Sequence, residues 1–179
     1  MKLFKFISSL FFLSGLLFVA ACGASGASGA SGSTVTSTPT PTQTPTSPHL
    51  GQTADQILAG LKGKNLPIGA SFTYTATNDP NNLLGRPSEY VSKDNFIDTR
   101  IATNDTGVNI TTSDGGAIET FANVANAQKR FSYLQSLSTS GNPLFAEYEY
   151  LDGTVILRIS TRLTPNQAEA YQTALKTLP

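Results

Sequence analysis

The sequence is poor in the residues that most often carry chemistry. It contains one cysteine, Cys22, one histidine, His49, and no tryptophan. A disulfide within the chain is therefore excluded, and so is a zinc site built from several cysteine and histidine side chains. His49 follows a segment rich in threonine and proline, where a catalytic base is not expected. These absences predict a protein without a metal, a cofactor or a catalytic residue.

Charged residues are also scarce, and they do not cluster. They make up 13% of the chain, with 12 basic and 12 acidic side chains, so neither sign dominates. Binding to nucleic acid requires a basic patch that neutralises phosphates. We therefore expect no nucleic-acid partner.

Residues 1–21 have the composition of a secretory signal. Lys2 and Lys5 precede an uncharged, mostly apolar run over residues 6–21. That run has roughly 16 residues, fewer than the roughly 20 that a membrane-spanning helix needs. The segment is expected to be removed on export.

The apolar run ends in VAAC, residues 19–22. This stretch resembles the lipobox of bacterial lipoproteins, in which an aliphatic residue and two small residues precede the modified cysteine. The resemblance implies that the Cys22 sulfur receives a diacylglyceryl group and that the chain is cut before Cys22. It also implies a site for acylation at the new amino group. The alternative is a free or buried cysteine at the end of an uncleaved helix.

A lipidated Cys22 predicts where the protein resides. Each buried methylene contributes about 0.8 kcal/mol, so two acyl chains anchor a protein stably where one does so marginally. The expected location is the cell membrane, with the lipid as anchor and the domain facing outside the cytoplasm.

Residues 22–52 are expected to form a disordered tether. They repeat Ala-Ser-Gly over residues 24–32 and then consist mainly of serine, threonine and proline. Such residues bury too little apolar surface to offset the entropy lost on ordering. Chain scaling gives about 30 residues a mean reach of roughly 30 Å, which holds a domain clear of the membrane.

Hydrophobic periodicity over residues 53–179 predicts one globular α+β domain. Helices are expected after Thr53, Asn123 and Thr164, which suit N-cap positions. Alternating residues predict strands, the third of them short, at residues 68–76, 96–101, 108–110, 115–121, 144–151 and 154–163. This α-β-β-(β)-β-α-β-β-α order favours an antiparallel sheet of four to five strands, with about three helices packed mainly on one face. Its β-α-β-β-α end resembles half of a ferredoxin-like fold.

The last two strands flank Asp152-Gly153, a dipeptide that favours a two-residue hairpin turn. In that register Glu147 lies opposite Arg158. One hairpin face is apolar and faces the core, whereas the face with Glu147, Glu149 and Arg158 is expected to meet solvent. Glu119 is expected to share this outer face with Glu147 and Glu149, and two carboxylates can hydrolyse a glycosidic bond. However, glutamates on an exposed strand usually form a solvated surface.

Residues 78–96 predict a long connection without regular structure. Such a segment in a compact domain is usually functional. It contains Arg86, Tyr90 and Lys93, which suit an anionic or carbohydrate ligand and are our ligand-binding candidates. The alternative is a structural connection in which Leu83 and Leu84 fill the core.

Short motifs across most of residues 54–179 resemble domains of uncharacterised bacterial lipoproteins. They are LLGRP with the Tyr, Lys and Phe that follow it, GG.IE.F, EYEY..G and LTP.QA..Y. The resemblance implies no activity and no residue role.

Together these features favour a lipid-anchored extracytoplasmic binding module without catalytic activity. Its expected partners are the membrane, through the lipid on Cys22, and an envelope protein or carbohydrate. The alternatives are an enzyme or enzyme accessory that acts on cell-wall polymers, and a structural surface protein.

Replacing Cys22 with Ser tests the lipobox interpretation. We expect the variant to leave the membrane fraction or to keep its first 21 residues, because serine offers no sulfur for the diacylglyceryl group. Fractionation and intact-mass measurement in a bacterial host report both outcomes. Unchanged anchoring together with unchanged processing would refute the interpretation.

Overall fold

A computed structural model describes residues 47–104 and 107–179, so Cys22, the expected signal and most of the expected tether lie outside the described residues. The described part contains three α-helices and a five-stranded antiparallel sheet. This arrangement confirms the predicted α+β class, element order and strand count. No helix of the described part is long and apolar enough to span a membrane.

The helices and strands alternate along the chain. They are α1 (Ala54–Lys62), β1 (Ile68–Thr73), β2 (Ser92–Asp98), β3 (Gly115–Thr120), α2 (Val124–Ser138), β4 (Glu147–Asp152), β5 (Val155–Ser160) and α3 (Pro165–Leu175). The strand order in the sheet is β1-β2-β3-β5-β4. Each helix begins where predicted, because the side chains of Thr53, Asn123 and Thr164 accept a hydrogen bond from a backbone N–H of the first turn.

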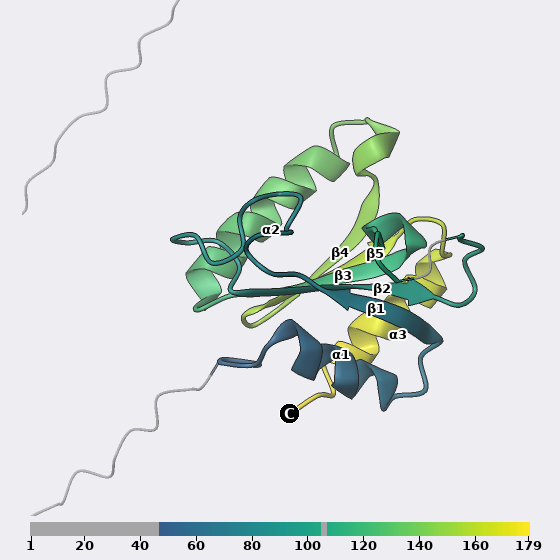
Figure 1. The fold of residues 1–179 in the computed structure, drawn as a ribbon, viewed down its shortest axis with the longest axis horizontal. Coiled ribbons are helices and arrows are strands. Elements are labelled where there is room, and N and C mark those ends of the chain that lie inside the picture. The colour runs from purple at the N-terminus through teal and green to yellow at the C-terminus, as the bar shows by residue number, and fades with distance from the viewer. Residues whose placement is uncertain (1–46, 105–106) are drawn as a thin grey trace, which may run out of the picture. The chain divides into compact units, whose positions relative to one another are not determined.

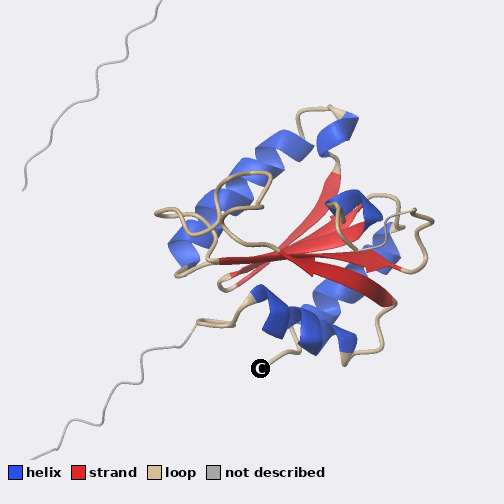
Figure 2. Ribbon diagram, viewed as in Figure 1, coloured by secondary structure: helices blue, strands red, loops and turns tan. Residues whose placement is uncertain are grey.

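The helices lie on both faces of the sheet. α1 and α3 cover one face, and α2 covers the other (Figures 1 and 2). The larger core lies under α1 and α3; its buried side chains include Ile57, Leu61, Phe96, Ile118, Leu157, Ile159, Tyr171 and Leu175. A smaller core under α2 contains Tyr90, Phe121, Ala127, Leu134 and Ile156.

The first strands differ from their predicted bounds. β1 ends at Thr73, and β2 covers residues 92–98 instead of 96–101. The pattern missed the start of β2 because Lys93 and Asn95 are polar yet buried, each with a buried partner. The short strand predicted at residues 108–110 is wrong: the Ile110 carbonyl accepts a hydrogen bond from the Asn95 side chain at 2.7 Å instead of joining a strand ladder.

The β4–β5 hairpin turns one residue later than predicted. Asp152 pairs with Val155, so Glu149 lies opposite Arg158. This register differs from the predicted one by two residues, which leaves every side chain on its expected face. Gly153 has φ +55°, and a Cβ there would lie 2.1 Å from the Pro48 carbonyl oxygen.

Residues 47–52, which the composition assigned to the tether, pack on the folded domain. The Pro48 carbonyl accepts a hydrogen bond from the Thr154 N–H at 3.3 Å. The His49 side chain is 1% exposed, and its ring nitrogens lie 3.0 Å from the Gln52 side-chain oxygen and 3.4 Å from the Asp152 carboxylate. The expectation that His49 lies in a disordered segment is therefore wrong.

Asp94, in β2, is a buried carboxyl group. Neither of its oxygens has a hydrogen-bond partner among the described residues. Burial raises the pKa of Asp94 from 3.8 to about 6. Thr73 lies opposite Asp94 on β1, and its nearby hydroxyl reduces this shift, although the two groups do not form a hydrogen bond of good geometry. Between pH 3.8 and about 6 the folded protein therefore holds a proton that the unfolded chain releases.

Replacing Asp94 with Asn tests this penalty. Below pH 3.8 the Asp94 carboxyl is protonated in both the folded and the unfolded state, and it does not destabilise the fold by its charge. As the pH rises from 3.8 through about 6, the folded state loses this stability, because the buried carboxyl must then ionise. We expect D94N to raise the free energy of unfolding on the order of 2 kcal/mol at pH 8, with the gain shrinking as the pH falls to 4. Urea unfolding across this range measures it. Glu169→Gln, on the exposed face of α3, is the control, and a gain that is independent of pH would contradict the account.

Candidate functional site

A layer of buried charges joins α2 to the sheet. Glu119 of β3 is fully buried, and its carboxylate accepts hydrogen bonds from Arg130 of α2 at 3.0 and 3.2 Å. It also accepts one from Arg158 of β5 at 2.9 Å. Arg158 in turn donates to both carboxylate oxygens of Glu147 in β4, at 2.7 and 2.9 Å. The ion pairs thus connect β3, β4, β5 and α2.

Glu119 is ionised in the fold. Burial alone would raise the pKa of its carboxyl group, but the guanidinium groups of Arg158 and Arg130 hold the pKa below its usual value. The prediction that the face with Glu147, Glu149 and Arg158 meets solvent is wrong, because α2 lies over it. Only 14% of the Arg158 side chain and 16% of the Glu147 side chain are exposed.

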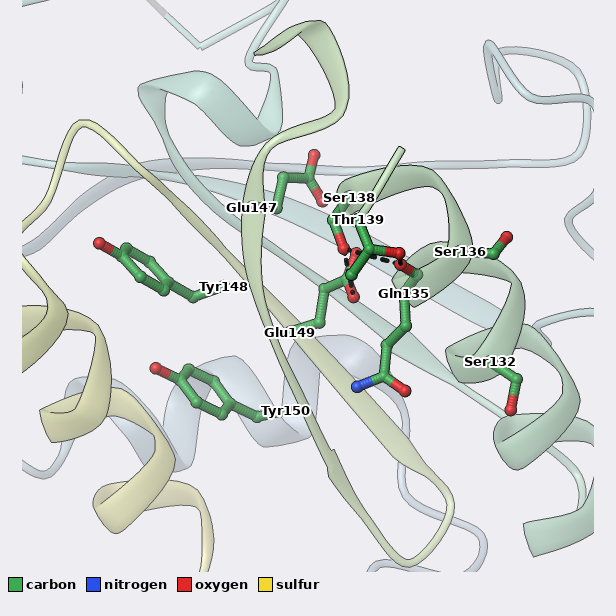
Figure 3. Close-up of a pocket in the computed structure, with 9 residues that line it drawn as sticks. All are labelled: Ser132, Gln135, Ser136, Ser138, Thr139, Glu147, Tyr148, Glu149 and Tyr150. Carbon is green, nitrogen blue, oxygen red and sulfur yellow. Dashed lines mark hydrogen bonds between the residues drawn. The ribbon is translucent and has the colours of Figure 1, made fainter. Parts of the chain in front are cut away.

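A polar groove of about 550 Å³ lies between α2 and β4 (Figure 3). Hydroxyl, amide and carboxylate side chains supply most of its lining, which consists of Ser132, Gln135, Ser136, Ser138, Thr139, Glu147, Tyr148, Glu149 and Tyr150. The rings of Tyr148 and Tyr150 point away from α2, toward the other face of the sheet (Figure 3). The groove therefore meets β4 at its two glutamates and at the strand's backbone.

Glu149 is the titratable group of this groove. Burial, and then the nearby charge of Glu147, raise the pKa of Glu149 from 4.5 to about 7. The Ser138 hydroxyl donates a hydrogen bond to the Glu149 carboxylate at 3.3 Å. Near neutral pH, Glu149 can therefore accept hydrogen bonds as a carboxylate or donate one as an acid.

The structure separates the three ligand-binding candidates. Arg86 is exposed, whereas Tyr90 and Lys93 are buried. The Tyr90 hydroxyl donates to the carboxylate of Asp79 at 2.5 Å, and the Lys93 ammonium does so at 2.8 Å. The same carboxylate accepts the backbone N–H of Leu83 at 2.9 Å. Tyr90 and Lys93 thus hold the connection together through Asp79, and ligand binding by the three candidates stays a prediction.

Asp79 stays ionised at the centre of this arrangement. Burial alone would raise its pKa, but the hydrogen bonds from Lys93 and Tyr90 hold the pKa of Asp79 well below its usual value. The connection between β1 and β2 is consequently fixed by charge, although it contains no helix or strand.

Sequence reasoning missed the groove, although the chain carries a signal for it. Residues 131–141 contain no charged side chain and five serines or threonines. The exposed face of a helix usually carries charges on its polar side. An uncharged run rich in hydroxyl groups, next to a strand with two glutamates, is therefore unusual.

No group of three or more metal-ligating side chains occurs in residues 47–104 and 107–179. No protein-family model, no curated protein and no solved structure matches the chain.

Replacing Glu119 with Gln tests whether the ion pairs hold α2 in place. The substitution leaves two buried guanidinium groups without their shared carboxylate, and breaking a buried pair in this way costs about 3–5 kcal/mol. We expect a loss of that order in the free energy of unfolding, measured by urea denaturation, and faster amide exchange in α2. A loss no greater than that of Glu169→Gln would show that α2 is held by other contacts.

Proposed function

We propose that the chain is a lipid-anchored extracytoplasmic binding module whose groove between α2 and β4 takes a neutral, hydroxyl-rich ligand such as an envelope saccharide. The residue types of the lining carry this proposal, because seven of its nine residues are serine, threonine, glutamine or glutamate. The anchor rests on the motif at residues 19–22.

The chemistry of the lining suits sugar hydroxyls. The hydroxyls of Ser136, Ser138 and Thr139 donate to backbone carbonyls of α2, so toward a ligand they act as acceptors. The Gln135 amide both donates and accepts hydrogen bonds, as sugar hydroxyls do. Glu149 adds a carboxylate that accepts hydrogen bonds from ligand hydroxyls.

No lysine or arginine is among the residues that line this groove, and Arg158 behind it is already paired with Glu147. An anionic ligand would therefore meet Glu149 without a cation of its own to pair with.

The groove is also held rigid from behind. Arg158 fixes Glu147 with two hydrogen bonds, and Arg130 ties α2 to the same charged layer through Glu119. A binding surface that is ordered before the ligand arrives loses less entropy on binding. This rigidity favours recognition of a ligand of fixed shape.

A second candidate is hydrolysis of a glycosidic bond by Glu147 and Glu149. The raised pKa of Glu149, about 7, favours it, because a general acid must be protonated at working pH. However, both oxygens of Glu147 already accept hydrogen bonds from Arg158. Glu147 is thereby a poor nucleophile or base, and binding without hydrolysis is the better account.

Calorimetric titration with chitotetraose, a neutral oligosaccharide, tests the proposal. We expect Gln135→Ala and Glu149→Gln each to weaken binding about fivefold, the loss of one hydrogen bond. Glu169→Gln, which removes a carboxylate from α3, should bind like the unmodified chain. Tetragalacturonate, similar in size but anionic, should bind about tenfold more weakly than chitotetraose, because its carboxylates face Glu149 and find no free cation in the lining.

The same samples separate the two candidates. Binding with the oligosaccharide intact after prolonged incubation, seen by mass spectrometry, supports a binding module. Cleavage that disappears in Glu149→Gln would establish the hydrolase instead. Absence of binding to chitotetraose, or binding that ignores Gln135 and Glu149, would contradict the proposal.

A further inference from the structure

A second hollow, of about 310 Å³, lies beside the middle of α2. The connection between β1 and β2 forms its opposite wall. Its lining consists of Leu83, Ser88, Glu89, Lys129, Arg130 and Tyr133. It shares no residue with the groove described above, and it contains neither Arg86, Tyr90 nor Lys93.

The apolar part of the hollow comes from Leu83 and Tyr133. Leu83 packs against the smaller core, and Tyr133 is 53% exposed. The Arg130 guanidinium lies 5.6 Å from the centre of the Tyr133 ring, a cation–π distance. Two hydrogen bonds to Glu119 fix the guanidinium group on which the Tyr133 ring packs. The carboxylate of Glu119 also compensates the charge of Arg130.

The uncompensated charges of the hollow are Lys129 and Glu89. They come from opposite walls, Lys129 from α2 and Glu89 from the connection. Neither forms an ion pair with another residue of the described part. A ligand with a carboxylate and an ammonium group would pair with both side chains. A ligand with only one of these groups would pair with one side chain and be repelled by the other.

The size of the hollow limits the ligand. Its volume is at the lower end of the range of small-molecule sites, about 300–1,000 Å³. An apolar side chain placed between the two charged groups would contact Leu83 and Tyr133.

We infer that this hollow is a second binding site, which takes a dipeptide-sized zwitterion with an apolar side chain. Lys129 pairs with the ligand carboxylate, Glu89 pairs with the ligand ammonium group, and Tyr133 and Leu83 contact the apolar side chain. The ion pair between Asp79 and Lys93 fixes the wall that carries Leu83 and Glu89. The site gives the long connection between β1 and β2 a role in binding, and it does not depend on saccharide binding in the groove.

Titration with alanyl-phenylalanine tests the site, alongside the same dipeptide acetylated at its amino end or amidated at its carboxyl end. We expect the full chain to bind the free dipeptide and each blocked form to bind about fivefold more weakly, the loss of one charged contact. In Lys129→Gln the free and amidated forms should bind equally. In Glu89→Gln the free and acetylated forms should bind equally.

Lys176→Gln, at the C-terminal end of α3, is the matched control and should retain the full discrimination. Chitotetraose binding, measured on the same samples, should be unchanged in Lys129→Gln and Glu89→Gln. Absence of dipeptide binding, or equal binding of all three forms by the unmodified chain, would overturn the second site. A loss in Lys129→Gln no larger than in Lys176→Gln would do the same.

Discussion

The arrangement of this domain depends on the ion pairs that the buried carboxylate of Glu119 forms with two arginines. A charge at that depth is stable only when other groups pair with it. Arg158 meets it from the neighbouring strand, and Arg130 meets it from α2. The position of α2 over the sheet is therefore set by an ionic contact as well as by packing.

Both hollows border α2, which buries few of its own residues. Of the residues in α2, only Ala127 and Leu134 are buried, whereas α1 buries four residues in nine. A helix with so few apolar contacts leaves space along its sides. The polar residues near its C-terminal end face β4 across one space, and Lys129 and Tyr133 face the β1–β2 connection across the other. The ion pair between Asp79 and Lys93 keeps that connection in place.

Local chemistry in the sequence predicted the fold well, and long-range contacts explain its errors. The three helix starts follow from N-cap residues that act within one turn. The β4–β5 turn instead contacts Pro48, which is distant in sequence and whose carbonyl accepts the Thr154 N–H. A hairpin with Glu147, Glu149 and Arg158 on one face of its two strands indicates a solvated surface, unless a helix distant in sequence covers that face and adds Arg130 to the same network. Tyr90 and Lys93 suggested a binding loop because their partner is also distant in sequence. Both side chains donate hydrogen bonds to the carboxylate of Asp79.

The central claim is that the groove between α2 and β4, preorganised by the charges around Glu119, receives a hydroxyl-rich ligand. Backbone amide shifts recorded by NMR during titration with chitotetraose test it most directly. The account predicts that the largest shifts fall in residues 132–139 of α2 and 147–150 of β4 and follow one saturation curve. Shifts centred on other elements, or none at saturating oligosaccharide, would contradict it.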